Sequence, residues 1–220
     1  MFPYRRVVDL IPNPTDRSLV KEHYLLDFDC QALISELEQS SFTGCMKTVN
    51  VGRKSRSLSL LYKGSVVACA FTTALDPIPG DIDESLWLLI SELKSASGTV
   101  ASLYPLERSL VLPLSALFMG SPVSLSQNTT NSEGYAQAQA YFQTTKMSGA
   151  ICMVGSNLAV CIECIYKGEH SATIFVQEQL VLEGKAELCE LAARRSDMLL
   201  ESCVANPPSR TLRYKLSSLN

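Results

Sequence analysis

The sequence of 220 residues is poor in the side chains on which catalysis and metal binding depend. It contains only two histidines, His23 and His170, and one tryptophan. Lysine and arginine together number 19 against 22 acidic residues, and without a basic excess or stripe the chain lacks the usual nucleic-acid-binding surface. No apolar run approaches the ~18 residues of a membrane span, and no apolar secretory segment follows the first residues. We therefore expect a cytoplasmic protein that neither spans a membrane nor binds nucleic acid.

Motifs that carry chemistry are also scarce. The sequence has no glycine-rich phosphate loop, and no second Cys-x-x-Cys pair accompanies Cys161 and Cys164, whereas zinc requires four convergent ligands. Strand-like alternation over 158–166 places these two sulfurs on opposite faces. A nucleophilic pair of Cys164 and His170 could form across a turn, but a surface histidine is the simpler interpretation. We interpret the eight cysteines as reduced, buried thiols and expect no metal, no cofactor and no catalytic residue.

The most informative feature that is present is an internal repeat. Residues 61–64 (Leu-Tyr-Lys-Gly) recur as residues 165–168 (Ile-Tyr-Lys-Gly), and the match extends in both directions. Upstream Gly44 corresponds to Gly149, and the offset changes only at expected loops. The shared order predicts a tandem duplication. A single α/β domain with chance matches is the alternative.

Each copy is predicted to be an α+β module. It comprises a short helix, an antiparallel three-stranded meander, a longer helix and a further short strand. Within each meander a Lys-Gly pair, at 63–64 or 167–168, forms the tight hairpin turn, because glycine supplies the positive φ that such turns need. The apolar stripe of the longer helix in copy one is assigned to four residues, Leu86, Trp87, Ile90 and Leu93.

The expected strands and longer helices have the following ranges. In copy one the strands are 44–51, 57–62, 65–71 and 99–103, and the helix is 81–96; in copy two the strands are 149–154, 158–166, 172–176 and 201–205, and the helix is 185–198.

These ranges divide the chain into four parts. Residues 1–27 form an N-terminal arm, residues 28–119 the first module, residues 120–134 a linker, and residues 135–220 the second, more degenerate module. The linker is inferred from its polar composition and its lack of hydrophobic periodicity.

The first module contains an ordered series of short motifs. Residues 33–37 (Leu-Ile-Ser-Glu-Leu) precede residues 42–44 (Phe-Thr-Gly), residues 60–70 (Leu-Leu-Tyr-Lys-Gly-Ser-Val-Val-Ala-Cys-Ala) and residues 98–100 (Gly-Thr-Val). This order resembles the PATAN-like domains of bacterial signalling proteins, here in two tandem copies. The resemblance implies a protein-interaction and signalling role, often beside phosphorelay receiver domains.

We therefore expect a non-enzymatic bacterial signalling or adaptor protein, a monomer or homodimer, whose partners are other signalling proteins such as response-regulator receiver domains. The alternative is a small-ligand binder or an enzyme with a site in the cleft between the two modules. The candidate partner-binding residues are Tyr62 and Lys63 at the hairpin turn and an acidic group of Asp76, Asp81 and Asp83. An ordinary helix start, stabilised by the helix dipole, is the other interpretation of these acids.

Overall fold

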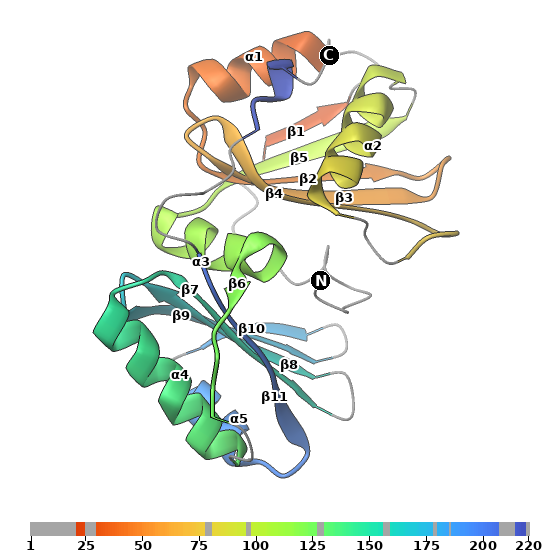
Figure 1. Cartoon of the computed structure of the whole chain (residues 1–220). Coiled ribbons are helices and arrows are strands. Elements are labelled where there is room, and N and C mark those ends of the chain that lie inside the picture. The colour runs from red at the N-terminus through yellow and green to blue at the C-terminus, as the bar shows by residue number, and fades with distance from the viewer. Residues whose placement is uncertain are drawn as a thin grey trace. The chain divides into compact units, whose positions relative to one another are not determined.

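The computed structural model of the chain describes residues 21–24, 30–77, 81–95, 98–126, 130–155, 159–177, 180–184, 186–206 and 214–218. These residues form an α+β fold with two antiparallel sheets, as predicted (Figure 1). The chain divides into two compact units, Met1–Val111 with Leu212–Asn220, and Leu112–Thr211. Of the predicted N-terminal arm, all but residues 21–24 lie outside the described residues.

The first unit is built around a five-stranded sheet with the order β1-β5-β2-β3-β4. Every neighbouring pair is antiparallel. Its elements are β1 (Lys21–Tyr24), α1 (Cys30–Gln39), β2 (Gly44–Asn50), β3 (Ser55–Tyr62), β4 (Ser65–Thr73), α2 (Ile82–Ser95), β5 (Thr99–Pro105), the start of α3 (Arg108–Met119) and the short 3-10 helix η3 (Leu216–Ser218).

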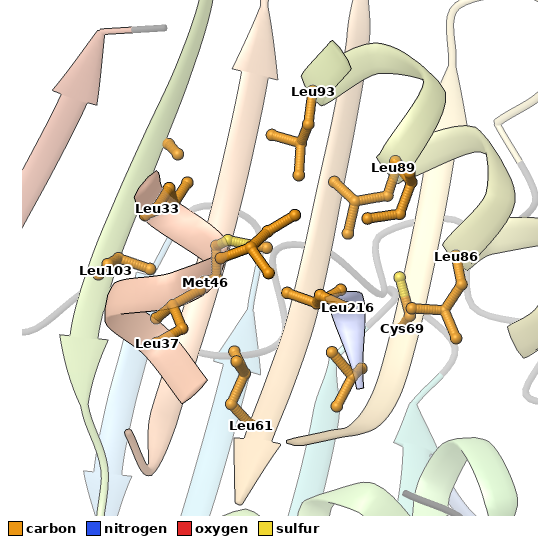
Figure 2. Close-up of a cluster of buried hydrophobic side chains, with 14 of the residues drawn as sticks. Leu33, Leu37, Met46, Leu61, Cys69, Leu86, Leu89, Leu93, Leu103 and Leu216 are labelled. Carbon is orange, nitrogen blue, oxygen red and sulfur yellow. The ribbon is translucent and has the colours of Figure 1, made fainter. Parts of the chain in front are cut away.

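Helices α1 and α2 cover one face of this sheet, and their apolar side chains meet those of the strands in a single core (Figure 2). Helix α1 contributes Leu33 and Leu37, one helical turn apart, so both point inward. Strand alternation presents Met46 and Leu61 to the same core. Packing against this core fixes the position of α2 and therefore determines which side of the helix faces solvent.

The side chain of Trp87 is not part of this core, which corrects the predicted apolar stripe. Leu86, Ile90 and Leu93 are buried as expected, whereas Trp87 is 68% exposed. Successive residues of an α-helix are rotated by about 100°. The face centred on the three buried residues therefore turns Trp87 toward solvent.

The segment 214–218 belongs to the first unit. The backbones of Tyr214 and Val66 exchange two hydrogen bonds, of 3.0 and 2.8 Å, and Leu216 is buried in the core beneath α1 and α2. The repeat in the sequence predicts that this segment belongs to the second module. Backbone pairing with β4 and burial of one leucine instead hold it to the first sheet.

The second unit is built around a six-stranded sheet with the order β10-β9-β8-β7-β11-β6. Helices α4 and α5 pack on one face, where Phe142, Met153 and Cys189 are among the buried residues. Its elements are β6 (Ser121–Pro122), α4 (Asn131–Thr145), β7 (Gly149–Gly155), β8 (Val160–Tyr166), β9 (Glu169–Gln177), β10 (Leu180–Gly184), α5 (Ala186–Arg194) and β11 (Met198–Ala205).

The two sheets are connected in the same manner. In the first, β5 returns to pair with β2, the first strand of the meander, and in the second β11 returns to pair with β7. The hairpin turns also match, because Lys63 and Gly64 have φ of 50° and 72° while Lys167 and Gly168 have φ of 53° and 81°. Two successive residues with positive φ are typical of a type I′ turn, and a tight hairpin was predicted at both places.

Part of the expected linker is ordered structure. Helix α4 begins at Asn131 and is capped by Thr130, which exchanges side-chain and backbone hydrogen bonds with Glu133 in a capping box. The Ser/Thr-x-x-Glu pattern of a capping box was present in the sequence and was missed. Strand β6 pairs with Val204 and Ala205 of β11. Within the described part of the expected linker, only Gly120, residues 123–126 and the cap Thr130 lie outside helices and strands.

Candidate interaction surface

Helix α2 begins at an aspartate that acts as its N-cap. The Asp81 carboxylate accepts a hydrogen bond of 2.9 Å from the backbone N–H of Glu84, and its carbonyl accepts one of 3.0 Å from Ser85. An N-cap side chain satisfies an amide that the first helical turn leaves unpaired. Asp81 thus has a structural role, and it remains exposed at the surface.

One side of α2 is exposed along its whole length. We call this side the α2 face; it consists of residues spaced three or four apart, namely Asp83, Glu84, Trp87, Ser91 and Lys94. Its acidic end lies at the helix N-terminus and its lysine at the C-terminus, which complements the helix dipole. An indole, the largest apolar side chain, stands at the middle of this otherwise polar face.

The phenol of Tyr214, in the C-terminal segment, lies close enough to the Asp83 carboxylate to interact with it. Partial burial, together with this interaction and the nearby negative charges, raises the pKa of Tyr214. The Tyr214 phenol therefore stays protonated beside Asp83.

Asp76 lies in the loop after β4, in a tight turn. Its N–H donates to Thr73 Oγ1 at 2.9 Å, and its carbonyl accepts from the N–H of Thr73 at 2.9 Å. The preceding residue, Leu75, is 98% exposed. This loop adds an acid and an apolar side chain to the surface of the first unit.

Tyr62 and Lys63 form a separate feature at the β3–β4 turn. Tyr62 is only 4% exposed, and two cations cover its ring, Lys63 Nζ at 5.7 Å and the Arg108 guanidinium at 5.2 Å from the centroid. Such cation–π contacts account for the aromatic residue here. The structure thus brings Asp81 and Asp83 together with Trp87 on α2, and it places Tyr62 and Lys63 elsewhere.

Each unit buries a glutamate between its sheet and its helices. In the second unit, Glu163 of β8 is 1% exposed and accepts hydrogen bonds from the Tyr135 hydroxyl at 2.7 Å and from Gln139 Nε2 at 3.1 Å. Burial raises the pKa of Glu163. In the first unit, Glu92 of α2 accepts a hydrogen bond from the Ser55 hydroxyl. Both carboxylates are enclosed, which suits a structural role.

A shallow hollow of about 390 Å³ lies at the β2–β3 turn of the first unit, with Lys54 and Arg56 on its wall. Other polar groups of this wall make internal hydrogen bonds, as Asn50 does with Thr99 at 2.8 Å. Among the described residues, no cluster of three or more histidine, cysteine or acidic side chains can hold a metal ion. None of the described helices has the length and apolarity to cross a membrane.

Comparison of the chain with protein-family models, with curated proteins and with solved structures gives no match. The function therefore has to be inferred from the geometry of the surface. The residue that sequence reasoning missed is Trp87, and a usable signal was present. Its helical neighbours Glu84 and Ser91, three residues before and four after, are polar, which is the pattern of an exposed face.

Proposed function

We propose that this chain is a non-enzymatic signalling or adaptor protein and that the α2 face binds a partner protein through Trp87. The observation that carries the proposal is the 68% exposure of the only tryptophan in the chain, beside two carboxylates on the same helix. Tryptophan is enriched among the residues that dominate binding energy at protein interfaces. Exposed aromatic groups with polar rims mark such interfaces.

The charges around Trp87 select the chemistry of the partner. Asp83 and Glu84 lie one helical turn before the indole, and Asp81 caps the same turn. The complementary partner is a segment that carries an apolar side chain flanked by lysine or arginine. Charges at the rim mainly raise the association rate and its salt dependence, while the central indole supplies affinity.

Two further observations support an adaptor role. The motif order of the sequence resembles tandem PATAN-like modules, a group whose implied role is protein interaction, with receiver domains as expected partners. The second unit differs from the expected module, because its first helix is the longer one and an additional strand, β10, precedes α5. Linked modules suit an adaptor, because tethering raises the effective concentration of the second module near a bound partner.

The single tryptophan makes the proposal directly testable by fluorescence. The full chain is titrated with an amphipathic peptide of lysine and leucine, and with the same peptide carrying glutamate for lysine. We expect a blue shift of the Trp87 emission with the lysine peptide alone, stronger at low ionic strength. The lysine peptide supplies the stated partner chemistry in its simplest form.

Calorimetry with matched variants tests the residue assignment. Trp87→Ala should weaken binding of the lysine peptide at least about tenfold, as truncation of an interface anchor does. Leu191→Ala, which removes a 57% exposed leucine from α5, should leave it unchanged. Equal affinity for both peptides, or equal loss in both variants, would show that the α2 face is not the binding surface.

A further inference from the structure

Two cysteine sulfurs meet inside the second unit. Cys161 on β8 and Cys189 on α5 are both fully buried, and their Sγ atoms lie 3.2 Å apart. Neither is in a disulfide. A disulfide bond is about 2.05 Å long, so the sulfurs need to approach by little more than 1 Å to form one.

This pair differs from the pairings that the sequence suggests. Cys161 and Cys164 are close in sequence, but the odd spacing sends them to opposite faces of β8, and only Cys161 belongs to the core beneath α4 and α5. The partner of Cys161 is instead supplied by a helix 28 positions later in the chain.

A line of polar groups leads from this pair toward the surface. Thr173 Oγ1 on β9 lies 3.7 Å from Cys189 Sγ and 3.0 Å from Nε2 of His170. Thr173 is fully buried, whereas His170 is exposed. A proton on Cys189 can therefore pass to Thr173 while Thr173 passes its own to His170. The thiol is in this way connected to a base at the surface.

We infer that Cys161 and Cys189 are a modification site, a dithiol that hydrogen peroxide converts into a disulfide between β8 and α5. This inference is independent of the proposed interaction function. Cys189 first passes its proton along Thr173 to His170. The Cys189 sulfur then attacks one peroxide oxygen and the O–O bond breaks, which gives a sulfenic acid and water. The Cys161 sulfur then displaces the sulfenic oxygen as a second water, so two thiols give up two electrons and peroxide yields two waters.

The negative charge of the nearby Glu163 disfavours a thiolate at Cys189. Glu163, Tyr135 and Gln139 are hydrogen-bonded to one another. Contact with the Cys161 thiol and burial raise the pKa of Cys189. The relay through Thr173 matters for that reason, because the deprotonated sulfur is the nucleophile.

The test uses the full, reduced chain treated with hydrogen peroxide, then denatured and alkylated for mass spectrometry. We expect the number of alkylated cysteines to fall from eight to six, and peptide mapping without reductant to show Cys161 joined to Cys189. Dithiothreitol should restore all eight. Eight alkylated cysteines after peroxide treatment, or a disulfide joining any other pair, would overturn the inference from the parent chain alone.

Two variants and one control complete the test. Cys189→Ala should keep its seven remaining thiols under the same treatment, whereas Cys164→Ala, the control on the other face of β8, should still lose two. His170→Asn removes the ring nitrogen that contacts Thr173 and should slow disulfide formation about fivefold or more. An unchanged rate in His170→Asn would overturn the relay, and failure of Cys164→Ala to form the disulfide would overturn the pairing.

Discussion

Gly64 lies directly against the backbone of Glu38. A Cβ atom on Gly64 would meet the Glu38 Cα at 2.8 Å and the Leu37 carbonyl oxygen at 2.9 Å, and the residue has φ of 72°. The Gly64 N–H also donates to the Phe42 carbonyl at 2.8 Å. The β3–β4 turn is thus seated on the end of α1, and both its conformation and its contacts require glycine.

Gly64→Ala should destabilise the chain by about 3 kcal/mol, since it combines the left-handed backbone penalty of ~1–2 kcal/mol with a steric clash. Gly98 is the matched control, because it has φ of 85° and a Cβ atom added to it would meet nothing within 4 Å. Gly98→Ala should cost only about 1 kcal/mol. Urea unfolding followed by circular dichroism measures both, and equal losses would argue against tight seating of the turn.

The pH dependence of stability should contain a contribution from Glu163. Because burial raises the pKa of Glu163 in the folded chain above its ordinary value of 4.5, the folded state keeps a proton that the unfolded state releases. The contribution to the free energy of unfolding is therefore complete below pH 4.5 and declines as the pH rises toward the folded pKa.

Glu163→Gln should remove this decline, since the amide cannot ionise and its oxygen can still accept from Tyr135. At pH 7 the variant should be as stable as the parent or more stable by up to ~1 kcal/mol. Unfolding in urea between pH 4 and pH 8 tests it, with the exposed Glu169→Gln as control. A Glu163→Gln variant with the same pH slope as the parent would contradict the assignment.

The sequence was informative wherever local chemistry decides structure. Paired Lys-Gly turns, helical apolar spacing at Leu33 and Leu37, and strand alternation at Met46 are local signals, and the fold class follows from them. Pairing across long sequence distances was not accessible in this way. The bridge between Val66 and Tyr214 and the contact between Cys161 and Cys189 depend on how whole elements come together. For the candidate surface, the sequence predicts Asp81 and Asp83 as surface residues, but it assigns Trp87 to the buried side of the helix.

The role of Asp81 as a helix cap can be separated from its charge. Asp81→Ala removes the acceptor for the Glu84 N–H and should cost about 1 kcal/mol, while Asp81→Asn should be almost neutral because asparagine caps as well as aspartate. Thermal or urea unfolding of the two variants measures this. If asparagine were as damaging as alanine, charge and not capping would be the contribution of Asp81 to stability.

The reactivity of the eight cysteines in the native chain should differ sharply with burial. Seven are buried and Cys30 on α1 is partly exposed. Burial raises the pKa of Cys45 and of Cys69 to about 12, which leaves almost no thiolate for alkylation at pH 8. Iodoacetamide at pH 8 should therefore modify only Cys30 in the folded chain, and all eight after denaturation in urea. Cys30→Ser should abolish the native reaction and keep seven sites in urea, whereas rapid modification of two or more cysteines in the folded chain would show that the cores of the two units are open to solvent.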